Sequence, residues 1–197
     1  MKRTVFAPLL TLVLAAAILL GASFGLQSIR QRKAAEEHLQ IMQTLLPGSE
    51  NFTVEPYSGE DHNIVSVHKG ENGFVIETTT QGYAGPITML IGVDNDGKVT
   101  GLVVREMSET FGLGANALND VDFLKQFLNS EGDFAIGSAD ADAFSGATAE
   151  VETEAEVYID GMTGATVTSK AIVRCVNSAV SYVTGADVGS GATSWGG

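Results

Sequence analysis

The sequence has few of the residues on which metal and nucleophile chemistry depend. Its 197 residues include one cysteine, Cys175, and three histidines. A single cysteine allows neither an internal disulfide nor a thiolate metal cluster, and we expect it to be a buried structural thiol. The histidines lack the spacing of a metal-binding pair, so we expect them to pack or to lie at the surface. The sequence also contains no phosphate-loop or nucleophile-elbow motif.

Basic residues are scarce, and they are placed unevenly. Residues 34–197 hold six of the 11 lysines and arginines and all 24 acidic residues, which gives this part of the chain a formal charge of −18. Phosphate backbones and anionic lipid head groups repel a surface this acidic. The charge therefore argues against a nucleic-acid partner.

A long apolar run lies near the N-terminus. No charged residue occurs from Thr4 to Ile29. A membrane-spanning helix needs about 20 apolar residues, whereas the apolar part of a cleaved signal peptide usually has about 7–15. The run therefore predicts a retained transmembrane anchor within residues 1–29. Basic residues flank both ends of the run, so the positive-inside rule does not orient it.

The rest of the chain divides into a linker, a domain and a tail. Residues 28–46 have helical periodicity, which Pro47-Gly48 ends, so residues 30–50 are predicted to form a juxtamembrane helix and linker. Residues 51–184 are predicted to form the folded domain. Residues 185–197 are rich in glycine and small polar residues, which predicts a flexible tail.

Strand-forming residues dominate the first half of the domain. β-branched residues alternate with turn formers from Asn51 to Glu106, which predicts β structure. The clearest hairpin pairs Ile87–Val93 with Val99–Val104 across the turn Asp94–Gly97. The two aspartates of that turn lack the spacing of a calcium loop, so we interpret them as turn residues.

Helical patterns follow in the second half. Asp120–Leu128 is predicted to be a short helix in which Phe123 and Phe127 meet in the core. Residues 130–157 have weak periodicity and are predicted to form a loop. Ser169–Val183 is predicted to be an amphipathic helix. The predicted fold class is therefore α+β, an antiparallel sheet with flanking helices, preceded by one N-terminal transmembrane helix.

One motif stands out directly before the second helix. Residues 160–169 read DGMTGATVTS, which places a minimal Gly-Ala pair between hydroxyl residues at a predicted helix start. Small side chains let a bulky group approach, and the unpaired N–H groups of a helix N-terminus suit a phosphate. Thr168 and Ser169 are predicted helix caps. A capped helix start after a loop explains the same letters, so both interpretations stay open at this point.

Asp160–Thr166 resembles the D-x-x-(S/T)-G-A-T flavinylation motif of membrane redox complexes. The resemblance extends to Leu46-Pro47-Gly48, to GYAGPITMLIGVDNDGKVTGLVV at 82–104 and to SETFGLGAN at 108–116. Together these segments resemble the G subunit of the Rnf-type ion-translocating electron-transport complex, and next the C subunit of the sodium-pumping NADH:quinone reductase. One departure is Phe111, where the family commonly has proline.

This resemblance implies a membrane-anchored electron-carrier subunit, incomplete as an enzyme alone, that serves a complex interconverting ferredoxin and NAD. It implies one FMN joined to Thr166 by a phosphoester, with the FMN domain on the extracytoplasmic side. The implied partners are membrane and iron–sulfur or flavin subunits, a flavin transferase for maturation, and membrane lipid. The alternatives are the C subunit of a sodium-pumping NADH:quinone reductase, or an anchored extracytoplasmic module that shares the fold without a redox role. The implied cofactor-binding residues are Asp160, Thr163, Gly164, Ala165, Thr166 and Thr168, with Glu109, Thr110 and Leu113 as further contacts.

The flavinylation motif occurs three times, at Asp142–Thr148, Asp160–Thr166 and Asp187–Thr193. Thr148 leads into a run of glutamates that would repel a phosphate, and Thr193 leads to the last residues of the sequence. Only Thr166 enters a predicted helix, and that helix carries Lys170 and Arg174. We therefore predict a single FMN on Thr166.

Overall fold

The computed structural model describes residues 30–107, 121–137, 157–162 and 164–186. The chain divides into two compact units, Met1–Ile41 and Met42–Gly197. Residues 30–41 of the first unit and 42–45 of the second are helical, which confirms the helix predicted after the apolar run. Within the described ranges, no helix is long and apolar enough to cross a membrane. The predicted anchor lies outside these ranges.

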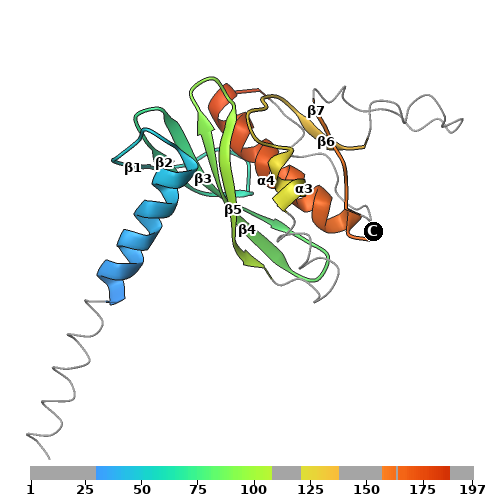
Figure 1. Ribbon diagram of the computed structural model, residues 1–197, viewed down its shortest axis with the longest axis horizontal. Helices are drawn as coiled ribbons and strands as arrows, with labels where there is room; N and C mark the ends of the chain where they lie inside the picture. The colour runs from blue at the N-terminus through green and yellow to red at the C-terminus, as the bar shows by residue number, and fades with distance from the viewer. Residues whose placement is uncertain (1–29, 108–120, 138–156, 163, 187–197) are drawn as a thin grey trace, which may run out of the picture. The chain divides into compact units, whose positions relative to one another are not determined.

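The second unit is built on an antiparallel sheet, as the sequence predicts, and this sheet has five strands (Figure 1). Each strand pairs with the next in the chain, so the spatial order is the sequence order. Such a meander needs only short connections, which agrees with the turn signals between the apolar runs. The strands are β1 (Thr53–Glu55), β2 (Ile64–Lys69), β3 (Gly73–Gln81), β4 (Pro86–Asp94) and β5 (Val99–Met107).

The β4–β5 turn forms where the hairpin was predicted. One carboxylate oxygen of Asp94 accepts hydrogen bonds from the backbone N–H groups of Asp96 at 3.0 Å and Lys98 at 2.8 Å. Gly97 has a φ of +90°, a conformation that glycine adopts without strain. The aspartate at the start of the turn therefore closes it.

A long helix, α4 (Thr166–Thr184), lies across one face of the sheet (Figure 1). Alternate residues of β4 on this face are fully buried, and the apolar stripe of α4 packs against them. Cys175 lies in this core with no exposed surface, and burial raises the pKa of its thiol to about 11. This confirms the prediction of a structural thiol. The main contributors are Ile87, Met89, Ile91 and Val93 from β4 and Ile172, Val176, Ala179 and Val180 from α4.

The opposite face of the sheet holds the chain segment that enters the domain. Gly92 of β4 and Gly101 of β5 are cross-strand partners, and the backbone of Leu45 lies against both. The hydroxyl of Thr100 donates a hydrogen bond to the Leu45 carbonyl oxygen. Neighbouring Leu46 is 1% exposed. The glycine pair thus forms a flat seat for this entering segment.

Replacing Gly92 with alanine is expected to destabilise the domain. An added Cβ would overlap the Leu45 carbonyl oxygen, and backbone cannot move aside as a flexible side chain can. We expect the free energy of unfolding to fall by about 1–3 kcal/mol, the usual cost of overpacking. Denaturant titration of the intact chain measures it. Gly101→Ala tests the same contact more mildly, because its Cβ would lie 3.0 Å from the nearest Leu45 atom, so we expect a smaller loss, and an unchanged free energy of unfolding in Gly92→Ala would contradict the seat.

A small second layer lies beside α4 (Figure 1). Strands β6 (Phe134–Ile136) and β7 (Val157–Ile159) pair in parallel, so the prediction of a loop throughout 130–157 is wrong at both ends. The side-chain amide of Asn177 in α4 fixes β6, since it accepts from Phe134 N at 3.1 Å and donates to Phe134 O at 3.0 Å. The rest of that predicted loop, residues 138–156, lies outside the described residues.

The short helix α3 (Val121–Lys125) falls within the predicted range Asp120–Leu128, of which Asp120 is outside the described residues. Phe123 and Phe127 meet edge to face with ring centres 5.5 Å apart, as predicted. Both rings are buried in the core under α4. The α3 segment therefore closes the core beside β6 and β7.

Candidate functional site

The motif singled out in the sequence lies between the end of β7 and the start of α4. Gln126, just after α3, holds the beginning of this connection. Its side-chain carbonyl accepts a hydrogen bond from Asp160 N at 2.8 Å, and its amide donates to Asp160 O at 3.4 Å. The preceding residue, Ile159, is fully buried. Sequence reasoning missed Gln126, because an isolated glutamine carries no pattern.

The conformation of the backbone explains the Gly-Ala pair of the motif. Ala165 N donates to Met162 O at 3.0 Å, which closes a four-residue turn. Gly164 occupies the third position with a φ of +81°, where a type II turn favours glycine. Ala165 follows as the N-cap residue and is 7% exposed, so a larger side chain has little room there. The turn leads directly into α4, and neither Gly164 nor Ala165 places a large side chain near the start of the helix.

The beginning of α4 corrects one prediction. The helix starts at Thr166, three residues before the predicted start, and its N-cap is Ala165, which has no side-chain acceptor. Thr168 and Ser169, the predicted caps, are buried in the first turn of the helix at 1% and 0% exposure. Two adjacent hydroxyl residues are typical of helix caps, but the turn that contains Gly164 starts the helix three residues earlier. Thr168 and Ser169 therefore lie inside the helix.

Ser169 instead ties the motif to the helix. Its hydroxyl oxygen accepts a hydrogen bond from Met162 N at 3.2 Å and donates to Ala165 O at 3.0 Å. The motif turn is thus held from Gln126 on one side and from Ser169 on the other. A turn held at both ends presents the next residue, Thr166, in a fixed place.

We expect Ser169→Ala to loosen this turn. The change leaves Met162 N without its acceptor, so the free energy of unfolding should fall by about 1–2 kcal/mol. Amide hydrogen exchange at Met162 should become faster, as mass spectrometry of peptides would show. Ser181→Ala is the matched control, because it removes a hydroxyl near the other end of α4 whose bond to Ala186 lies at the surface. Unchanged exchange at Met162 in Ser169→Ala would contradict the role of this hydroxyl.

Thr166 is exposed at the first residue of α4. The first N–H groups of a helix have no partner within the helix, and here the N-cap offers no side chain to satisfy them. The first turn of α4 contains no acidic residue. Lys170 is exposed one turn later, and the Arg174 guanidinium donates to the carbonyl of Gln81 at 3.0 Å, at the end of β3. This end of α4 is therefore suited to a phosphate carried on the Thr166 hydroxyl.

The other predicted site residues fall into three groups. Asp160, Gly164 and Ala165 lie in the connection that leads to Thr166, whereas buried Thr168 does not share its exposed surface. The remaining predicted residues lie outside the described part of the chain: Glu109, Thr110, Leu113 and Thr163.

Comparison with known proteins places the motif in a family. The family model of the FMN-binding domain matches residues 82–181, which include β4, β5 and the start of α4. The G subunit of an ion-translocating oxidoreductase complex from Methanosarcina acetivorans is 32% identical over 161 residues, covering 76% of each chain.

Two further matches are similar in kind. The G subunit of a proton-translocating ferredoxin:NAD(+) oxidoreductase complex from Clostridium ljungdahlii is 38% identical over 111 residues, 56% of this chain and 53% of that relative. The present chain thus spans about half the length of that relative. A crystal structure of the C subunit of Na(+)-translocating NADH-quinone reductase from Parabacteroides distasonis is 25% identical, covers 60% of each chain and has a TM-score of 0.43.

The family model covers half of the chain, and it includes both the sheet strands beside α4 and the exposed threonine at the helix start. The relative from Methanosarcina extends the match to three quarters of the chain. The chain belongs to the family of FMN-binding domain proteins.

Proposed function

We propose that this chain is a membrane-anchored electron-transfer subunit that carries one covalent FMN in a redox-driven, ion-translocating ferredoxin:NAD oxidoreductase complex of the Rnf type. The observation that carries the proposal is the exposed Thr166 at an N-terminus of α4 whose N-cap lacks a side-chain acceptor. The matched relatives support the kind of complex, because two of them are named as the G subunit of an ion-translocating or proton-translocating oxidoreductase. The chain would be one carrier in the complex, not a complete enzyme.

The residues at the start of α4 fit the phosphate end of FMN. The Thr166 hydroxyl oxygen would form the phosphoester, and the N–H groups of the first turn of α4 would face the remaining phosphate oxygens. Gly164 and Ala165 leave room for the group because neither has a side chain beyond Cβ. The bound flavin would accept and donate electrons, and the protein would hold it in place and set its surroundings.

We extend the proposal to the placement of the chain. Residues 1–29 would form a single-pass anchor in the cell membrane, and the FMN domain would lie on the extracytoplasmic side. The long uncharged run from Thr4 to Ile29 and the resemblance to the Rnf-type G subunit support this arrangement. The partners would be membrane and iron–sulfur or flavin subunits of the complex, a flavin transferase, and lipid.

The proposed cofactor has a direct test. We expect the purified full-length chain, produced together with a flavin transferase, to remain yellow and fluorescent after denaturation and to show the mass increment of one FMN. Chain produced without the transferase is the control and should lose any flavin when it unfolds. Flavin that separates from the transferase-treated chain on denaturation would contradict the covalent link, and a chain that takes up no flavin would contradict the electron-transfer role.

A further inference from the structure

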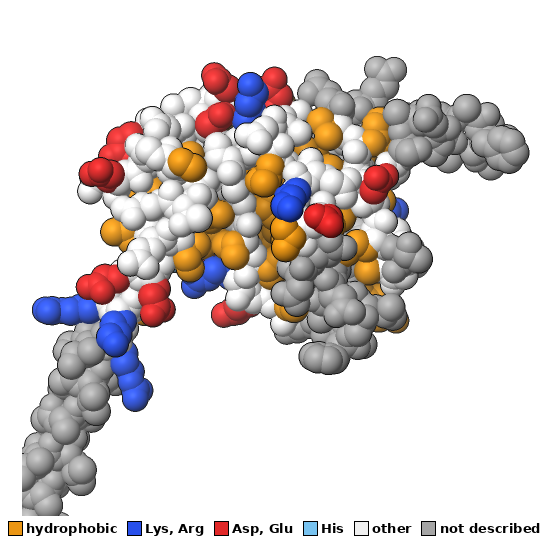
Figure 2. Space-filling view, viewed as in Figure 1, with side chains coloured by type: hydrophobic (Ala, Val, Ile, Leu, Met, Phe, Trp, Pro, Cys, Tyr) orange, Lys and Arg blue, Asp and Glu red, His pale blue; other side chains and the backbone are white. Residues whose placement is uncertain are grey.

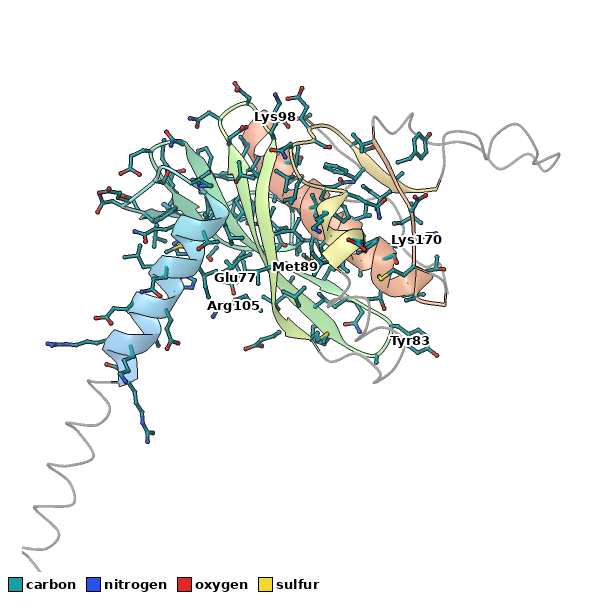
Figure 3. All side chains as sticks on the ribbon, in the orientation of Figure 1. Glu77, Tyr83, Met89, Lys98, Arg105 and Lys170 are labelled. Carbon is teal, nitrogen blue, oxygen red and sulfur yellow. The ribbon has the colours of Figure 1, made fainter. Side chains whose placement is uncertain are left out.

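Three side chains of α4 follow one another along a single line of the helix. Thr166, Lys170 and Arg174 are spaced by four residues, so they lie on one side of α4. Side chains in a helix lean toward its N-terminus, which directs the stem of Lys170 toward the turn that carries Thr166. Figure 3 shows Lys170 beside α4. A lysine in this position can reach a group attached to Thr166.

The two basic residues of this line are engaged differently. The guanidinium of Arg174 donates to Gln81 O at 3.0 Å and so connects α4 to the end of β3. Lys170 is exposed, and its ammonium has no hydrogen-bond or ion-pair partner among the residues that the structure describes. Arg174 therefore has a structural contact, while no residue in the described part of the chain pairs with the charge of Lys170.

The positive charge of Lys170 matters because the domain around it is strongly acidic. Residues 34–197 carry a formal charge of −18, and the face of the domain in Figure 2 shows acidic side chains and a few basic ones. An anionic flavin phosphate that approaches such a surface is repelled over a distance of about one Debye length, roughly 8–10 Å. A cation one helical turn from the acceptor hydroxyl lies within that range and offsets the repulsion there.

We propose that Lys170 is a positioning residue that draws the anionic phosphate of the incoming flavin to the Thr166 hydroxyl. The proposal rests on the function proposed above. The donor would be a flavin dinucleotide. The Thr166 oxygen forms a bond to the phosphorus on the FMN side, the pyrophosphate bond breaks, and a nucleoside monophosphate leaves. The hydroxyl proton passes to a base or to water, and no group is oxidised or reduced.

Lys98 provides a matched control for the charge. It is also exposed and likewise has no ion-pair partner in the described ranges. The adjacent Gly97 lies against Thr184, since a Cβ on Gly97 would be 2.6 Å from the Thr184 methyl carbon. Lys98 therefore lies at the C-terminal end of α4, and Figure 3 shows it far along the helix from Lys170. A helix of 19 residues is about 28 Å long, well beyond the screening distance.

The experiment measures the initial rate of covalent FMN incorporation into the intact chain by a flavin transferase supplied with flavin dinucleotide. At low salt we expect Lys170→Gln to slow incorporation about threefold and Lys170→Glu about tenfold, as screened charges one turn apart imply. Lys170→Arg should retain the wild-type rate, and so should Lys98→Gln and Lys98→Glu. The deficit of Lys170→Glu should shrink as salt is raised, which a merely structural defect would not do.

Several outcomes would overturn the role of Lys170. These are a wild-type rate in Lys170→Glu, equal slowing in Lys98→Glu, or a deficit that salt does not change. Each presupposes that the wild-type chain is loaded on Thr166. If the wild-type chain takes up no covalent FMN, the proposed function itself fails, and the role of Lys170 fails with it.

Discussion

Replacing Thr166 with alanine is expected to abolish covalent FMN on this chain. The substitution removes the hydroxyl of the first residue of α4. It leaves the turn before the helix intact, because the hydrogen bonds of that turn involve Ala165 and Ser169. Alanine is also a good helix former, so folding should be kept. The denaturation-resistant fluorescence should fall to background, and the mass increment of one FMN should be lost.

The other two copies of the motif provide the controls. Thr148→Ala and Thr193→Ala change the same kind of residue in the same kind of sequence, and both variants should keep the full fluorescence and mass increment. The distinction rests on the helix start, because Thr166 begins α4, whereas the acidic run after Thr148 opposes a phosphate. Peptide mass spectrometry that places FMN on Thr148 or Thr193 in the wild-type chain would contradict the choice of Thr166.

The main sheet could be predicted because its strands carry strong local signals. β4 is a continuous apolar run, and the structure explains why, since it is buried on both faces. Ile91 packs in the core under α4, while its neighbour Gly92 lies against Leu45 on the other face. The seat itself was not predictable, because it joins residues about 50 positions apart that no pairing rule connects. The two glycines inside strands were its only signal.

The smaller features show where local patterns fail. β6 and β7 have three residues each, too few for any periodicity, and they pair across a segment of 20 residues. Their stability comes from tertiary contacts such as the amide of Asn177, which a sequence pattern does not reveal. The start of α4 was misplaced for a related reason, because Thr168 and Ser169 have the side chains of caps but occupy buried positions in the helix.

The chemistry of the site could be predicted only in part. The turn from Met162 to Ala165 and the exposed position of Thr166 agree with a motif read from its letters. The two hydrogen bonds between Gln126 and Asp160 could not be predicted from the motif, because they depend on how α3 packs beside β7. A motif indicates which residue reacts, whereas the fold decides how rigidly that residue is held.

In the proposed arrangement, removal of residues 1–31 is expected to release the domain from the membrane while the domain still accepts FMN. Among the residues that the structure describes, the buried core begins at Met42, and the seat for Leu45 and the turn before Thr166 both lie within residues 42–197. The shortened chain should therefore be soluble, accept FMN on Thr166 when the transferase is present, and unfold cooperatively. Cell fractionation followed by flavin fluorescence on a denaturing gel measures both properties.

The same shortened chain is expected not to restore electron transfer in a strain that lacks the full-length chain. A tether keeps the flavin at a high effective concentration near its partner subunits, and a freely diffusing domain loses that advantage. Fusion of residues 32–197 to an unrelated single-pass anchor of the same orientation is the informative control. Recovery of activity by this fusion, but not by the soluble domain, would show that residues 1–31 act as a tether. Full activity of the soluble domain would contradict the anchor's role, and a shortened chain that stays insoluble would contradict an independently folded domain.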